Sequence, residues 1–147
     1  MIEFSRDEAR DLTIAFVVLV ICFAIATAGL DFQRFFSSLP IVIVGVAIGS
    51  ISHELGHKAT AMKYCCEAEY KIWPLGLVIA LVTSFFGVVF ASPGSTQIKS
   101  DHVSDEINGR ISIAGPIANT ALALMFIAIA ALLYPLKLHS VIFELIY

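Results

Sequence analysis

Long apolar runs separated by short polar segments dominate the pattern of the chain. A helix needs roughly 20 apolar residues to cross a hydrocarbon layer of about 30 Å. Three runs meet this requirement and are expected to be membrane-spanning helices: residues 12–30, 39–64 and 107–134. Ser5 and Glu8 have the spacing of a helix capping box, so a helix is expected to begin before the first run. Residues 31–38 are expected to form a turn, with Pro40 in the first turn of the second helix.

A fourth apolar stretch, residues 72–91, has a different pattern. It is long enough to cross a membrane, but it contains Pro74, Gly76 and Gly87 and is rich in β-branched and aromatic residues. Such interruptions are tolerated at membrane depth where protein shelters the backbone. The stretch is therefore expected either to cross or to re-enter as a β-like segment, and a substrate is expected to add as a strand near residues 84–91. Residues 92–106 form the longest polar linker.

The distribution of positive charge favours re-entry. Re-entry places seven of the nine Lys and Arg residues on one face of the membrane, whereas a crossing places six there. Because positive charge gathers on the cytoplasmic side, the end of the second span near residue 64 is expected to face the cytosol. The chain is thus expected to be a multi-pass protein of the cell membrane.

Composition supports the same fold class. The chain has 147 residues, of which 59% are hydrophobic and 14% charged, whereas a soluble domain carries about a quarter charged residues. We expect an all-α integral membrane protein with one transmembrane domain over residues 1–147, in contact with lipid. The net charge of −3 and the absence of a basic block argue against nucleic acid as a partner.

The second apolar run contains the sequence His53-Glu54-Leu55-Gly56-His57. Two histidines four residues apart on a helix differ by about 40° around its axis, so both rings project from one face. Each can offer a nitrogen to Zn²⁺, and Glu54 is placed to take a proton from a metal-bound water. Gly45 and Gly49 continue the same stripe, which predicts that a neighbouring helix packs closely there.

Two other interpretations of these residues remain open. Ionisable groups inside a membrane cost about 2.5 kcal/mol or more each, so they are retained mainly for function. A purely structural polar network could nevertheless satisfy them. A metal transporter could also use the histidine pair, although it would need acidic residues or histidines on several spans, and residues 12–30 contain none.

Asn119 is the other polar residue within a predicted span, in Gly115-Pro116-Ile117-Ala118-Asn119. Pro116 lacks an N–H and leaves the carbonyl of Ser112 without its helical partner, which predicts a bend. Asn119 either makes an interhelical hydrogen bond or supports the metal site or an extended substrate.

Together, HELGH on an apolar helix, the glycine-interrupted stretch and NGRISIAGPIAN resemble the site-2 protease family of intramembrane zinc metalloproteases, in particular its compact archaeal and bacterial members. The resemblance covers roughly residues 40–134. It implies a three-helix catalytic core that cuts membrane-spanning protein substrates, with zinc on His53 and His57 and water activated by Glu54. It also implies that Asn119 contacts the substrate.

One departure from the family pattern concerns the third zinc ligand. The resemblance implies an aspartate in a later Asp-Gly pair, and this sequence has no such pair. Catalytic zinc usually has three protein ligands. Either the chain is truncated before the helix that carries this aspartate, or a linker residue replaces it: Asp101, His102, Asp105 or Glu106. The missing ligand keeps a second function open, that of a non-catalytic protein of the same fold that binds a transmembrane partner.

Overall fold

The computed structural model describes residues 4–100 and 103–134. Along the chain the elements are α1 (Arg6–Ala28), α2 (Phe32–Lys63), β1 (Glu67–Ile72), α3 (Pro74–Ser84), β2 (Gly94–Lys99) and α4 (Asp105–Leu133). Three of these helices, α1, α2 and α4, are long and apolar enough to cross a membrane. The sequence-based expectation of three such helices is therefore confirmed.

Local capping decides where α1 and α2 begin. The Oγ of Ser5 accepts a hydrogen bond from the N–H of Glu8 at 3.1 Å, so α1 starts where the capping spacing predicts. The Oδ1 of Asp31 accepts from the N–H of Arg34 at 3.0 Å and starts α2 at Phe32. The expected turn over residues 31–38 is therefore wrong, and Pro40 lies inside the helix. An aspartate cap satisfies an otherwise unpaired N–H, which favours an earlier start than proline alone indicates.

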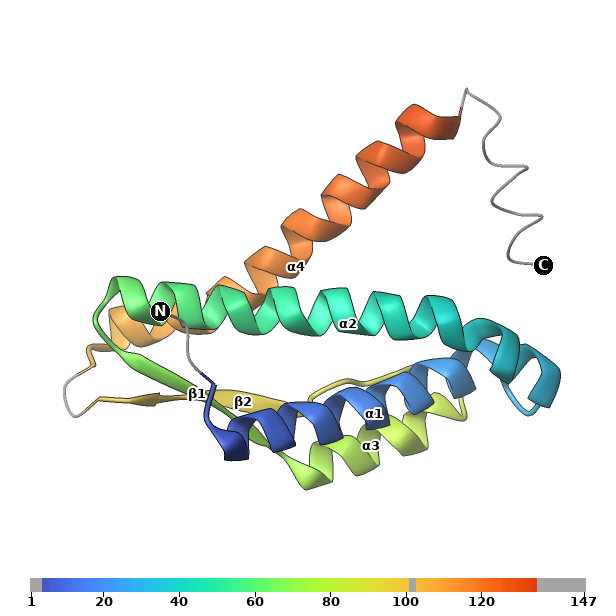
Figure 1. Cartoon of the computed structure of the whole chain (residues 1–147), viewed down its shortest axis with the longest axis horizontal. Helices are drawn as coiled ribbons and strands as arrows, with labels where there is room; N and C mark the ends of the chain where they lie inside the picture. Colours follow the sequence, from blue (N-terminus) through green and yellow to red (C-terminus); the bar gives the residue numbers. More distant parts are fainter. Residues whose placement is uncertain (1–3, 101–102, 135–147) are drawn as a thin grey trace.

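The helices lie in the order α3, α1, α2, α4, so that α1 is covered on two sides (Figure 1). Half of its buried positions are small residues, which let the neighbouring helices approach: Ala15, Cys22, Ala24 and Ala28. The C-terminal half of α4 projects away from the other elements, and large apolar side chains such as Leu124 and Ile127 are exposed on it. Such a surface is suited to lipid or to further protein.

The fold is not purely helical, because β1 and β2 form a two-stranded antiparallel sheet in which Tyr70 pairs with Thr96. β structure was expected within residues 72–91, but β1 reaches only the first residue of that stretch and β2 begins after it. β2 occupies part of the expected linker 92–106, and residues 85–91 form no strand. Exposed and less exposed residues alternate along β2, with Ser95, Gln97 and Lys99 exposed. In so short a segment this alternation is only a weak sequence signal for a strand.

The segment between the strands returns to its starting point. α3 has 11 residues, which corresponds to about 16 Å at the usual rise and is about half of a hydrocarbon layer. After α3 the chain turns at Gly87, whose φ is +77°, and comes back without regular structure. The N–H of Trp73 donates to the carbonyl of Pro93 at 2.9 Å, so both ends of the segment meet at the sheet.

Candidate active site

Two glycines bring α2 and α4 together at the HELGH motif. A Cβ on Gly56 would lie 2.7 Å from the carbonyl oxygen of Ala114, so only glycine permits this approach. On α4, a Cβ on Gly115 would lie 2.7 Å from Nε2 of His53 and would also collide with Nε2 of His57. The two Nε2 atoms therefore converge on the backbone of Gly115, and the GPIAN sequence faces the histidine pair.

Close packing does not occur at the two glycines where the sequence predicted it. Within the described part of the chain, a Cβ built on Gly45 or Gly49 meets no atom of another element within 4 Å. Instead, both glycines line a cavity of about 710 Å³. The stripe that they share with the histidines thus faces open space rather than a neighbouring helix.

His57 is buried and held in one tautomer. Its Nδ1–H donates to the carbonyl of Ile111 on α4 at 2.7 Å. The ring is therefore left with its lone pair on Nε2, the atom beside Gly115. A backbone carbonyl on the other ring nitrogen is a common support for a metal-ligating histidine, because it fixes both tautomer and ring orientation.

His53 has a matching support from Asn119. The Nδ2 of Asn119 lies 3.3 Å from Nδ1 of His53. In this orientation the amide donates to the ring, while its buried Oδ1 has no hydrogen-bond partner in the described part of the chain. Rotated by half a turn, the amide would instead accept from an Nδ1–H and leave the lone pair of His53 on Nε2. An interhelical hydrogen bond was one of the two roles considered for Asn119; it is present, and its partner is His53 of the candidate site.

Glu54 is 4% exposed and contacts the sheet. Its Oε2 accepts a hydrogen bond from Oγ1 of Thr96 on β2 at 3.3 Å, while its Oε1 is buried and has no hydrogen-bond partner among the described residues. Thr96 was not identified from the sequence, since it lies in the stretch expected to be a linker. The unpaired oxygen is free to accept a proton or a hydrogen bond from a bound molecule.

Tyr70 adds a further polar group beside Glu54. The side chain is buried, and its hydroxyl has no hydrogen-bond partner in the described part of the chain. Burial, with a smaller contribution from the negative charge of Glu54, raises the pKa of Tyr70 above its ordinary value, so the hydroxyl keeps its proton and can act as a donor. Tyr70 lines the 710 Å³ cavity together with His53, Glu54 and Asn119.

These residues fit two ligand positions of a zinc site. Two convergent imidazole nitrogens with supported Nδ1 atoms are a suitable donor set, and the three buried polar atoms that lack partners lie around the same cavity: Glu54 Oε1, Tyr70 OH and Asn119 Oδ1. A buried polar atom without a partner is costly unless a bound group satisfies it.

No third metal-ligating side chain joins the histidine pair among the residues that the structure describes. Residues 4–100 and 103–134 contain no group of three or more His, Cys, Asp or Glu side chains able to hold a metal. Glu106, one expected substitute, is exposed and pairs with Arg110 at 2.7 Å, and Asp105 lies beside it in the first turn of α4. Neither joins the histidine pair. Asp101 and His102 lie outside the described residues.

Comparison with known proteins identifies a relative over most of the chain. The sequence is 35% identical over 136 residues to a Methanocaldococcus jannaschii protein named "Putative zinc metalloprotease", an alignment that covers 90% of this chain and 67% of the relative. No protein-family model and no solved structure matches. Given the identity and coverage of this match, the chain belongs to a family of zinc metalloproteases.

Proposed function

We propose that the protein is an intramembrane zinc endopeptidase, which hydrolyses peptide bonds in transmembrane or membrane-anchored protein substrates. One observation carries the proposal. The Nε2 atoms of His53 and His57 converge beside Gly115, next to a buried Glu54 with one unpaired oxygen, on a helix long and apolar enough to cross a membrane. The name of the relative supports the zinc and protease parts of the proposal, and the long apolar helices support the intramembrane part.

In this proposal the histidines hold the metal and Glu54 moves the proton. Zinc on His53 and His57 would lower the pKa of a bound water and polarise a carbonyl group. Thr96 holds Oε2 of Glu54 and leaves Oε1 available. Through Oε1, Glu54 would accept a proton from the attacking water and then deliver it to the departing amine. Tyr70 would donate its unpaired hydroxyl to the substrate.

The substrate would reach the site through the 710 Å³ cavity. Its walls are formed mainly by apolar and small side chains of α1 and α2, and His53, Glu54, Tyr70 and Asn119 also line it. This arrangement suits an apolar peptide segment whose scissile bond lies beside these polar side chains. We place the added substrate strand on β2 rather than on residues 84–91, because β2 is a strand and contacts Glu54 through Thr96.

The proposal also includes the side of the membrane that the candidate site faces. The sheet lies near the N-terminal ends of α1 and α4 and the C-terminal end of α2 (Figure 1), and Lys58, Lys71, Lys99 and Arg110 belong to this end of the molecule. We therefore propose that the site faces the cytosol of a cell membrane. We also propose that the third zinc ligand comes from chain outside the described residues.

Zinc content and cleavage together test the proposed function. Purified protein in detergent should contain zinc that is lost in His57→Ala. Glu54→Gln should keep this zinc and lose cleavage, by about 100-fold or more as expected for a general base. Glu106→Gln, which changes an exposed carboxylate on α4, is the matched control and should retain both. If Glu54→Gln cleaves as well as the wild type, the catalytic role of Glu54 is wrong.

A further inference from the structure

The two edges of the small sheet differ in their hydrogen bonding. In an antiparallel pair, alternate residues direct both their N–H and their C=O toward the partner strand, and the residues between them direct both groups away. The N–H groups of Tyr70 and Ile72 bind side chains of α1, so the even-numbered residues of β1 point away from β2. Their partners Thr96 and Ile98 must then point to the opposite edge, on the far side of β2.

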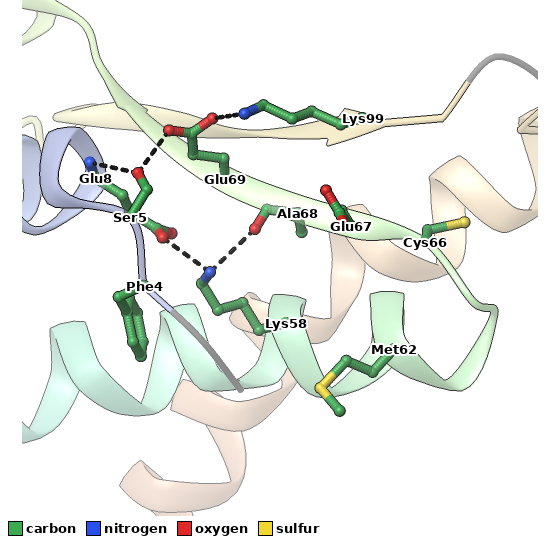
Figure 2. Close-up of a pocket in the computed structure, with 10 residues that line it drawn as sticks. All are labelled: Phe4, Ser5, Glu8, Lys58, Met62, Cys66, Glu67, Ala68, Glu69 and Lys99. Atoms are coloured by element: carbon green, nitrogen blue, oxygen red, sulfur yellow. Dashed lines mark hydrogen bonds and ion pairs between the residues drawn. The ribbon is translucent and has the colours of Figure 1, made fainter. Parts of the chain in front are cut away.

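Charged side chains bind one backbone group at each of three outward positions of β1, Ala68, Tyr70 and Ile72. The N–H of Tyr70 donates to Oε1 of Glu8 at 3.0 Å, and the N–H of Ile72 donates to Oδ2 of Asp11 at 3.2 Å. Lys58, the residue after His57, donates from Nζ to the carbonyl of Ala68 at 3.0 Å and to Oε2 of Glu8 at 2.9 Å (Figure 2). Three successive outward positions of β1 are thus bound by α1 and α2.

The edge of β2 is different. Among residues 4–100 and 103–134, no hydrogen bond is made to the outward N–H and C=O groups of Thr96 or Ile98. An unpaired strand edge is a template for another strand. The sheet therefore offers one open edge, and it belongs to the strand whose Thr96 contacts Glu54.

The burial of these charges indicates a specific role. Glu8 is 1% exposed and Lys58 6% exposed, and taking two charges out of water is costly even when they pair. Glu8 and Lys58 each also bind a backbone group of β1. An ion pair that only linked two helices would not make these contacts. Lys58 adjoins a zinc-site histidine in sequence, so the contacts connect the helix of the site directly to the sheet.

We infer that Glu8 and Asp11 are positioning residues, which close the β1 edge and hold β2 in register with Glu54, so that a substrate strand can add only at the β2 edge. This inference rests on the proposed function. Neither residue touches the zinc site itself. They would act by setting where along an extended substrate the scissile bond meets Glu54.

Amide hydrogen exchange on the zinc-loaded protein in detergent tests the closed edge directly. Asp11→Ala removes the acceptor of the Ile72 amide, and Asp11→Asn keeps one. Asp7→Ala is the matched control, because Asp7 is an exposed carboxylate one turn earlier on α1, 69% exposed at its side chain. The Ile72 amide should exchange about 10- to 100-fold faster in Asp11→Ala, the range expected for a lost hydrogen bond to a charged group.

The exchange results separate the outcomes clearly. Protection at Ile72 that is lost in Asp11→Ala, and kept in Asp11→Asn and Asp7→Ala, supports the inference. Fast exchange at Ile72 in the wild type, or unchanged exchange in Asp11→Ala, overturns it. The Lys71 amide, which points toward β2, is an internal reference and should stay protected throughout. Because Glu8→Ala would also remove the ion pair that Glu8 makes with the buried Lys58, the Asp11 variants are preferred.

Cleavage positions test the consequence for substrate. A synthetic peptide with one transmembrane segment is incubated with each variant, and the cut bonds are mapped by mass spectrometry. We expect Asp11→Ala to retain zinc but to cut at shifted or additional bonds with kcat/KM about 10-fold lower, and Asp11→Asn to cut like the wild type. Identical positions and rates in Asp11→Ala would overturn the register claim. Absence of cleavage by the wild type would instead contradict the proposed function. In that case the hydrogen exchange of the Ile72 amide alone would test whether Asp11 closes the β1 edge.

Discussion

Gly115→Ala tests the geometry of the candidate zinc site with the addition of one methyl group. The new Cβ would lie 2.7 Å from Nε2 of His53 and would collide with Nε2 of His57. Ordinary contacts begin at about 3.4 Å, so the His53 ring would have to retreat by about 0.7 Å (3.4 − 2.7). His57 cannot swing freely, because Ile111 holds its Nδ1 at 2.7 Å.

A displacement of this size exceeds what a metal site tolerates. Functional groups must be held within about 0.5 Å of their productive positions, and metal–ligand distances within about 0.2 Å of their usual values. We therefore expect Gly115→Ala to lower zinc affinity by about 10- to 100-fold, the range seen when the supports of metal ligands are altered.

The assay is zinc content and chelator competition on purified protein, with Gly109→Ala as the matched control. Gly109 lies on the same helix, and a Cβ there would meet no atom of another element within 4 Å among residues 4–100 and 103–134. Its substitution should keep zinc and stabilise the helix by about 0.5–1 kcal/mol, because alanine loses less backbone freedom than glycine. Zinc affinity in Gly115→Ala within twofold of the wild type would refute the convergence of the two Nε2 atoms on Gly115.

Three further outcomes follow from individual contacts. Asn119→Ala should lower zinc affinity by about 10-fold, since His53 loses its support; unchanged affinity in chelator competition would show that Asn119 does not orient the ring. Tyr70→Phe removes a buried hydroxyl without a partner, so the thermal midpoint should not fall while kcat should drop; a lower midpoint with normal kcat would assign Tyr70 to stability instead. Hydrogen bonds from Lys99 first, then Ser5 and Lys71, lower the pKa of Glu69 from 4.5 to about 2. A lowered folded-state pKa contributes stability that is present above pH 4.5 and is lost as the pH falls toward 2; in denaturation followed against pH, Glu69→Gln should reduce this loss, and an identical acid profile would contradict the assignment.

The sequence alone was sufficient for features that depend on local composition. Three apolar runs predicted three helices of membrane-spanning length, because each satisfies its backbone hydrogen bonds internally. The spacing of His53 and His57 predicted that both rings share a helix face, and the start of α1 followed from Ser5 and Glu8. The predicted start of α2 was wrong because two local signals for a helix start compete there. The helix begins after the cap at Asp31 and not at Pro40.

Only the tertiary structure could decide what lies opposite these residues. Gly45 and Gly49 predicted close helix packing, but the close packing occurs at Gly56 and Gly115. The sequence of one helix cannot decide this, because the distance between two helices depends on the residues that both contribute to the contact. The strands were missed since β1 and β2 are short and pair across the intervening α3.

The same reasoning applies to the polar partners of the site. Ile111 and Asn119 reach the histidines from α4, Thr96 reaches Glu54 from β2, and Glu8 reaches β1 from α1. Each contact joins residues more than 40 positions apart in the chain. The sequence determined which chemical groups are present and on which helix face the motif lies. The packing of the elements decided which of those groups meet, because hydrogen bonds act over about 3 Å in space regardless of separation along the chain.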